Sequence, residues 1–174
     1  EGDIAAGLGA HGPNGDANDN LTVDFGFGLP ASTYSIGNRV WIDTNGNGLL
    51  DGGESGIGNV TVELLDSANA VIRSIQTDAG GYYRFDNVPA GRYTVRIPAS
   101  NFGAGAPLEG SLSSAGNTVG TDSRDNGIDN ATPAVNGIVS SPITLGAGLQ
   151  PAGEADLAAG LGAHGPSGDA SDTL

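Results

Sequence analysis

The sequence predicts an all-β fold, an antiparallel β-sandwich with long loops rich in glycine, asparagine and aspartate. The 174 residues include 31 glycines, and Asp, Asn and Gly favour turns over helices. Short segments with apolar residues at every second position recur through the middle of the chain, as in half-buried strands. These segments follow one another at intervals of ~8–12 residues, which is typical of a sandwich.

The first expected strand lies near residues 34–43, and others lie in IGNVTVELLD, AVIRSIQTD, GYYRF, GRYTVRI and SSPITL. The alternating apolar positions are Ile36, Val40 and Ile42; Val60, Val62 and Leu64; Tyr93, Val95 and Ile97; and Ile143 and Leu145. Turn-forming residues separate the strands at 67–69, 78–81 and 89–91. We expect an extended loop over 99–137 and assign no structure to 146–170.

The charge of the chain excludes several classes of partner. Twenty Asp and Glu accompany only six Lys and Arg, all of them arginine, so the formal net charge is −14. Six scattered arginines form no basic patch for nucleic acid or an anionic membrane. No apolar run approaches the ~20 residues that cross a bilayer. Without cysteine, disulfides and thiolate zinc sites are excluded. We therefore expect no nucleic-acid partner and no membrane insertion.

The two ends of the chain repeat one another. Residues 1–21 align with residues 154–174 at an offset of 153, and 16 of the 21 pairs are identical. His11 and His164 occupy the same repeat position, so they do not belong to one catalytic cluster. The chain starts at Glu1 with no leader pattern, and we expect it to be a processed chain or a part of a longer one. It holds one full period and the beginning of a second.

The segment after the first copy predicts how repeat units join. Leu21, Val23, Phe25 and Phe27 alternate with small or polar residues, as in a half-buried strand. The second copy stops at Leu174, just before the equivalent strand. We therefore expect residues 1–29 to close the preceding unit and residues 30–174 to form a unit without its final strand. Such a unit exposes a groove and a sheet edge. The strand of another unit can fill them by strand addition, within one long chain or between separate subunits.

Residues 43–54, DTNGNGLLDGGE, match the twelve-residue EF-hand calcium loop. Alternate residues of this tightly wound loop converge on one centre, where calcium takes roughly six to eight oxygens. The expected ligands are the side chains of Asp43, Asn45, Asn47, Asp51 and Glu54 and the carbonyl of Leu49, with Gly48 at the turn. With Asn at two positions the loop carries −3, which predicts an affinity suited to extracellular calcium. The alternative is an Asn-Gly hairpin with solvated acids.

Several other polar residues are weaker candidates. Asp122, Asp125, Asn126 and Asp129 crowd into eight residues and form a candidate second calcium site without a fixed template. Asp78 and Asp86 flank the GYYR strand and could bind calcium from its two ends. Asp16 and Asp19, with their repeat equivalents Asp169 and Asp172, are better explained as solvated polar loops. Asn20, Asn59 and Asn130 begin Asn-x-Ser/Thr sequons, and Pro133 weakens the third as a glycosylation site.

Two segments of the sequence resemble a known family. SIGNRVWIDTNGNGLLDGGESGIGNVTVELLD and TDAGGYYRFDNVPAGRYTVRI are similar to the B domains of bacterial serine-aspartate repeat surface proteins, in the prealbumin-like, collagen-adhesin-B group of stalk modules. The resemblance covers residues 34–98, and TVDFGF at 22–27 extends it. It implies an immunoglobulin-like sandwich that binds calcium and serves as a spacer on the bacterial surface. Some relatives have an internal Lys–Asn isopeptide bond, which this lysine-free chain cannot form.

Two functional classes remain. The first is a structural module of an extracellular bacterial surface stalk or filament, whose partners are identical or homologous units in a homopolymer or tandem array. The second is an adhesin module that binds a host protein or glycan. A period of 153 residues favours the first, because stalks need stackable units. We do not expect an enzyme, since the histidines lie in a glycine-rich repeat and nearly every acid lies in a turn.

Overall fold

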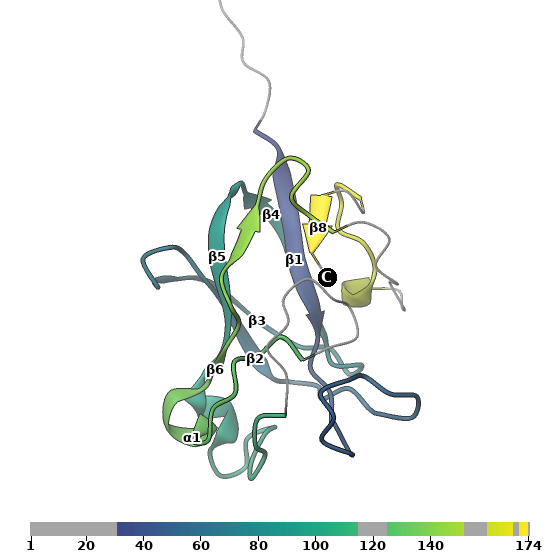
Figure 1. The fold of residues 1–174 in the computed structure, drawn as a ribbon, viewed down its shortest axis with the longest axis vertical. Helices are drawn as coiled ribbons and strands as arrows, with labels where there is room; N and C mark the ends of the chain where they lie inside the picture. The colour runs from purple at the N-terminus through teal and green to yellow at the C-terminus, as the bar shows by residue number, and fades with distance from the viewer. Residues whose placement is uncertain (1–30, 115–124, 152–159, 169–170, 174) are drawn as a thin grey trace, which may run out of the picture. The chain divides into compact units, whose positions relative to one another are not determined.

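The strands of the computed structural model form two sheets that share one apolar core (Figure 1). The compact unit that contains them runs from Ser32 to Leu174. The fold is the all-β immunoglobulin-like sandwich that the sequence predicts. Among the described residues, no helix has the length and apolar character needed to span a membrane. The described residues are 31–114, 125–151, 160–168 and 171–173.

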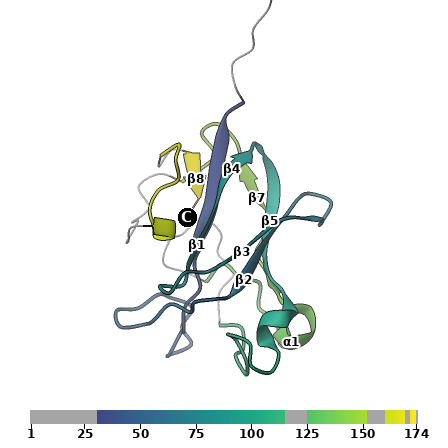
Figure 2. The ribbon, with the colours of Figure 1, turned by 180° about the vertical axis from the view of Figure 1, so that it is seen from behind.

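One sheet has the strand order β4-β1-β8, and the other has the order β3-β2-β5-β6, with β7 also paired to β5 (Figure 2). Among these strands all pairs are antiparallel except β1 and β8, which are parallel. The strands are β1 (Thr33–Arg39), β2 (Thr61–Leu65), β3 (Val71–Gln76), β4 (Tyr82–Pro89), β5 (Gly91–Ile97), β6 (Ile138–Val139), β7 (Ile143–Leu145) and β8 (Asp172–Thr173). In the described part of the chain, short helices lie in the connections: η2 (Ala99–Phe102), α1 (Pro133–Asn136) and η3 (Gly160–Gly162).

The core is built from the alternating residues that the sequence singles out. Val62 and Leu64 of β2 are fully buried, and Leu64 lies opposite Val95 of β5. From the other sheet, the paired residues Ile36 and Phe85 pack into the same cluster. Complete burial of a side chain of this size stabilises the fold by about 1.5–3 kcal/mol. The predicted alternation on β2 and β5 is confirmed.

The first strand is shorter than the sequence predicts. β1 ends at Arg39, and Ile42 is 54% exposed instead of buried. Val40 still packs against the core, so the alternation is lost only between Val40 and Ile42. Trp41 then forms an isolated bridge with Gly56 before the chain turns into the 43–54 loop. The prediction that Ile42 faces the core is therefore wrong, because a two-residue period does not reveal a local break.

The segment predicted as an extended loop, residues 99–137, takes part in the core. Phe102 and Leu108 are buried, and η2 and α1 contact each other. Isolated apolar residues in a segment rich in Gly, Ala and Ser have no period, so the sequence gives no signal that they are buried. The end of the sandwich is thus covered by a segment of irregular structure.

Asn101 fastens this segment to β2. Its side chain is buried, and its Oδ1 accepts the N–H of Thr61 at 2.8 Å. Its Nδ2 donates to the carbonyls of Thr61 at 2.9 Å and Pro98 at 3.2 Å. One amide side chain therefore satisfies both backbone groups of a strand residue.

Asn101→Ala is expected to lower the free energy of unfolding by roughly 2–4 kcal/mol, because it leaves the N–H and C=O of Thr61 without these partners. Urea denaturation followed by circular dichroism measures the change. Ser100→Ala, at the exposed neighbouring position, is the matched control and should change stability by less than about 0.5 kcal/mol. Equal stability of the two variants would contradict this role of Asn101.

Candidate calcium loop and apolar groove

The 43–54 loop winds tightly around the carboxylate of Asp43. Oδ1 of Asp43 accepts the N–H groups of Gly46 at 2.7 Å and Asn47 at 3.2 Å, and Oδ2 accepts that of Gly48 at 2.7 Å. Gly46 and Gly48 have φ angles of 69° and 72°, which glycine adopts without steric strain. The first residue of the motif thus organises the turn that the glycines allow.

The next three predicted ligands meet at one point. Nδ2 of Asn45 and Nδ2 of Asn47 each lie 2.8 Å from the same oxygen of Asp51, Oδ2. Glu54 closes the loop, because its Oε1 accepts the N–H of Thr44 at 2.8 Å and its Oε2 that of Asp51 at 2.9 Å. Leu49, whose carbonyl is the remaining predicted ligand, is half-buried. Its N–H donates to Asn47 Oδ1 at 2.7 Å. The polar side chains of the loop thus bond to one another and to the loop backbone, while Asn45, Asn47 and Asp51 stay exposed to solvent.

The predicted ligands of the loop are oxygen donors, the type of ligand that calcium prefers. Asp51 and the two Asn side chains already converge, and a half-turn of each amide would point its oxygen in place of its nitrogen toward Asp51. That rotation exchanges the present hydrogen bonds of the amide oxygens for metal bonds. Among the described residues, no group of three or more His, Cys, Asp or Glu is close enough to hold a metal. A cation here would therefore need the amide and carbonyl oxygens as well as the carboxylates, as hard cations accept.

The second predicted acidic segment adjoins the first. The N–H of Asp125 donates to the carbonyl of Gly48 at 2.8 Å, and Gly127 bridges to Ser140 beside β6. Burial raises the pKa of the Asp125 carboxyl, and the charges of Asp129 and Asp43 raise it further against the hydrogen bond from Gly127. Two segments that the sequence presents as separate candidates thus place negative charge at one end of the sandwich. Asp122 lies outside the described residues.

Ser114 belongs to this site although no motif marks it. Its hydroxyl donates to Oδ2 of Asp43. This hydrogen bond, with those from the loop N–H groups, holds the pKa of Asp43 below its usual value in spite of burial. Ser114 is 71 residues from Asp43 in the sequence, in a serine-rich segment, so no local pattern could have revealed the contact.

The other predicted aspartates have local structural partners. Oδ1 of Asp78 accepts the N–H groups of Gly80 and Tyr82 in the turn before β4. Asp86 lies within β4 rather than at its end, and it pairs with Arg84 at 2.8 Å. Their role as calcium ligands stays a prediction.

For Asp172, the prediction of a solvated polar loop is wrong. Its side chain is only 1% exposed, and it accepts hydrogen bonds from its own segment. Asp16, Asp19 and Asp169, for which the same loop is predicted, lie outside the described residues.

The predicted glycosylation sites differ in their surroundings. Asn59 is exposed in a left-handed turn, with a φ angle of 61°. Asn130 uses its side chain within the protein: Nδ2 donates to the Gly137 carbonyl at 2.6 Å, and Oδ1 accepts the Thr132 N–H at 2.9 Å. Asn20 lies outside the described residues, as do the strand residues Leu21, Val23, Phe25 and Phe27. Glycosylation stays a prediction.

An apolar groove of about 560 Å³ lies beside β1, with walls from both sheets. Its lining includes Ile36, Tyr83, Val95, Ile97, Phe102 and Leu108. Several of these residues also belong to the core cluster or pack against it, so the groove is an open continuation of the core. Burial raises the pKa of Tyr83, which keeps its hydroxyl neutral at the groove wall.

The lining of the groove also includes β8 and unsatisfied polar atoms. Thr173 of β8 and Gly37 and Arg39 of β1 belong to it. Nε1 of Trp41 and Oγ of Ser113, both in the lining, are buried without a hydrogen-bond partner among the described residues. Buried donors of this kind usually have a partner. The groove therefore offers apolar walls together with polar groups that a backbone segment could satisfy.

Residues 34–113 match the family model of the SdrD B-like domain. This segment contains the 43–54 loop, strands β1 to β5 and η2. Residues 34–113 are therefore similar to SdrD B-like domains. The recognised resemblance is thereby confirmed, while strands β6, β7 and β8 lie beyond the matched part of the B-like domain.

Relatives of the B-like domain occur in staphylococci. The chain is 48% identical over 79 residues to serine-aspartate repeat-containing protein I of Staphylococcus saprophyticus, covering 45% of this chain. It is 47% identical over 77 residues to serine-aspartate repeat-containing protein D of Staphylococcus aureus strain MW2, covering 44% of this chain. Protein F of Staphylococcus epidermidis is 43% identical over 79 residues, again 45% of this chain. The matches span only 4%, 6% and 5% of the lengths of these relatives.

Proposed function

We propose that this chain is a structural repeat module of an extracellular bacterial surface stalk or filament, stabilised by calcium. Successive units join by strand complementation: the strand Leu21–Phe27 of one unit fills the apolar groove of another. The groove is the observation that carries this proposal. It continues the core toward the surface beside β1, and its lining includes the exposed side chains of Ile42 and Leu112; apolar concavities with a few polar groups are preferred binding sites.

The direction of β8 leads a following strand toward the groove. Asp172 and Thr173 pair in parallel with Ser35 and Ile36. Asp172 corresponds to Asp19 in the first repeat copy. Because Ile36 of β1 faces the core and pairs with Thr173, a strand that enters the groove with its apolar residues toward the core needs a shift of one residue from this register, as a β-bulge supplies. Gly37 lies in the groove lining. Backbone groups of such a strand could also accept the N–H of Trp41.

Chain length favours a strand from another unit over the strand that precedes β1 itself. In a straight strand of this kind, Phe27 would lie about ten residue positions past Thr33 along the direction of β1. In a parallel sheet this is a distance of roughly 33 Å. The six residue steps from Phe27 to Thr33 span at most ~22 Å. The chain could not return to begin β1. The strand that fills the groove therefore comes from a neighbouring unit.

Calcium would stiffen the end of the unit that carries the 43–54 loop. Asp43, Asp51 and Glu54 bring three negative charges, and Asp125 adds a fourth beside them. A bound cation would remove this repulsion and hold the loop to the 125–127 segment. Extracellular modules bind calcium with dissociation constants of about 10⁻⁴–10⁻³ M, which suits a loop with two neutral Asn ligands. The resemblance to bacterial surface proteins also supports an extracellular location.

Deletion of residues 22–27 from the 174-residue chain tests the assembly. In calcium, the parent chain is expected to associate, with a mass by light scattering that grows with protein concentration, because its strand enters the groove of another molecule. The deletion variant should stay a monomer of 17.1 kDa or slightly less. Thr22→Ala with Asp24→Ala, on the polar face of the strand, is the control and should still associate. Concentration-dependent growth of the deletion variant equal to that of the parent would reject strand complementation.

A further inference from the structure

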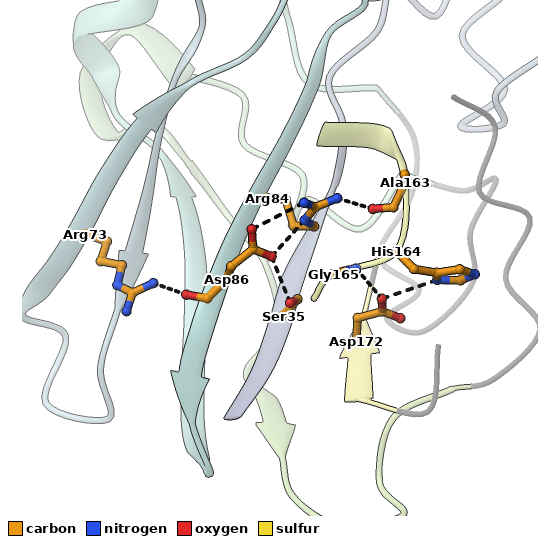
Figure 3. A network of polar contacts seen from close by, with 8 residues as sticks. All are labelled: Ser35, Arg73, Arg84, Asp86, Ala163, His164, Gly165 and Asp172. Carbon is orange, nitrogen blue, oxygen red and sulfur yellow. Dashed lines mark hydrogen bonds and ion pairs between the residues drawn. The ribbon is translucent and has the colours of Figure 1, made fainter. Parts of the chain in front are cut away.

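The second repeat copy is attached to the sandwich by a compact set of polar contacts (Figure 3). We call Ser35 of β1 with Tyr82, Arg84 and Asp86 of β4 the receptor face, and residues 160–173 the docked segment. Arg84 donates to the carbonyl of Ala163 and pairs with Asp86. Ser35 donates to the same carboxylate at 2.9 Å. The receptor face is thus held in place by its own hydrogen bonds and offers Arg84 to the backbone of the docked segment.

Asp172 holds the docked segment in shape. Its Oδ2 accepts the Gly165 N–H at 2.8 Å and lies 3.2 Å from Nδ1 of His164. The Asp172 side chain is 1% exposed, and its Oδ1 has no partner among the described residues. In Figure 3 these contacts lie beside Ser35, to which Asp172 is also paired through the β1–β8 ladder. A buried carboxylate therefore links the Ala163–Gly165 turn to the strand that follows.

The fit of the docked segment depends on two glycines. A Cβ at Gly165 would lie 1.9 Å from Oγ of Ser35, and a Cβ at Gly162 would lie 2.9 Å from the Tyr82 ring. The first distance is far below any van der Waals contact. The segment can therefore lie on the receptor face only with glycine at position 165.

The first repeat copy preserves every residue that makes these contacts. Gly162, Ala163, His164, Gly165 and Asp172 correspond to Gly9, Ala10, His11, Gly12 and Asp19. Within the described part of the docked segment, the copies differ only at Ser167, Ser171 and Thr173, which are Asn14, Asn18 and Asn20 in the first copy. None of these three is buried, and no side-chain contact to the receptor face involves them. The first copy can thus make the same contacts.

We propose that residues 7–20 of one chain bind the receptor face of another copy of this chain and displace residues 160–173 from it. The exchange rests on the proposed strand complementation, because the strand 21–27 decides its direction. Both copies offer the same contacts to the receptor face, so alone they would compete on nearly equal terms. Within these 174 residues the strand Leu21–Phe27 follows the first copy, so in a polypeptide of this length the first copy gains the burial of that strand in the groove. Polar docking sets the direction, a one-residue shift after it turns the apolar side chains of the strand toward the core, and their burial drives the exchange.

The resulting contact is head-to-tail. The donor segment and the receptor face are different surfaces of the same chain, so each copy can donate to one neighbour and receive from another. Heterologous contacts of this kind give open filaments unless the rotation between copies closes a ring. The partner predicted for this surface is therefore a second copy of this chain.

A matched pair of glycine variants of the full chain tests the proposal. Gly12→Ala should raise the dissociation constant for association at least tenfold in sedimentation equilibrium, because the new Cβ would meet Ser35 of the other copy. Gly165→Ala introduces the same clash within the competing segment, so it should lower that dissociation constant at least threefold. Asn14→Ser makes the first copy match the second and should leave association unchanged. His11→Ala and His164→Ala, which alter the Asp19 and Asp172 contacts, should repeat the opposite shifts if Gly165→Ala does not fold.

The opposite direction of the two shifts is decisive. Equal dissociation constants for Gly12→Ala, Gly165→Ala and the parent would overturn the exchange, as would shifts of the same sign. If Gly12→Ala associates normally while deletion of residues 22–27 abolishes association, strand complementation stands and the docking proposal falls. If neither change affects association, both fall.

Discussion

Appending Thr-Val-Asp-Phe-Gly-Phe after Leu174 is expected to turn the associating chain into a monomer with a much higher melting temperature. The added residues repeat 22–27 and would continue β8 into the groove of the same molecule. Each fully buried Val or Phe contributes about 1.5–3 kcal/mol, so three of them contribute roughly 4.5–9 kcal/mol. At ~2–4 °C per kcal/mol for a domain of this size, the melting temperature should rise by about 10 °C or more.

The matched control is an appended segment of the same composition in the order Phe-Phe-Val-Thr-Asp-Gly. Because successive side chains of a strand point to opposite faces, this order cannot place all three apolar side chains in the groove in either register, so this chain should gain less stability and continue to associate. Calorimetry and light scattering on the two chains separate a specific strand from a merely hydrophobic tail. Identical behaviour of both chains would argue against a strand in the groove.

Removal of calcium is the second large effect. Chelation is expected to lower the melting temperature of the parent chain by roughly 5–10 °C, since a site held at 100 times its dissociation constant contributes about 2.7 kcal/mol, at ~2–4 °C per kcal/mol. The loss follows from renewed repulsion among Asp43, Asp51, Glu54 and Asp125. Calorimetric titration should detect binding in the parent chain. An unchanged melting curve in chelator would exclude a structural ion in the 43–54 loop.

Two variants of aspartate residues test whether the calcium response comes from the 43–54 loop. Asp51→Asn should weaken calcium binding about tenfold or more, because it removes a charged ligand at the point where both Asn side chains converge. Asp66→Asn is the control: Oδ1 of Asp66 accepts the N–H groups of Ala68 and Ala70 in a turn outside the loop. It should lower the melting temperature by the same amount with and without calcium. A calcium response lost in Asp66→Asn and kept in Asp51→Asn would place the ion elsewhere.

The sequence predicts those parts of the fold that depend on local periodicity. Val62 and Leu64 alternate with Thr61 and Glu63 and are buried as expected. Ile42 continues the same period in the sequence, but β1 has ended at Arg39 and the Ile42 side chain is 54% exposed. Periodicity also gives no information about isolated buried residues such as Phe102. Local patterns therefore identify strands well and their ends poorly.

The candidate site is likewise predictable from the sequence only where its contacts are local. Residues 43–54 are recognisable because the predicted ligands, and the hydrogen bonds that join them, lie within twelve residues. The contacts of Asp43 with Ser114 and of Gly48 with Asp125 join segments more than 70 residues apart, and only the folded chain brings them together. Asp172 shows the opposite error: its glycine-rich surroundings suggest a solvated turn, whereas its side chain is buried beside β1.

The parallel pairing of β1 and β8 has a mechanical consequence for a chain under tension. In a tandem array, one neighbour would pull on the beginning of β1 and the other on the far end of the strand that follows β8. Because the two strands run in the same direction, these opposed pulls act along the ladder and load its hydrogen bonds together, in shear. An antiparallel closing strand would instead be opened one bond at a time from its end. The closing geometry of this sandwich suits a unit that must resist stretching.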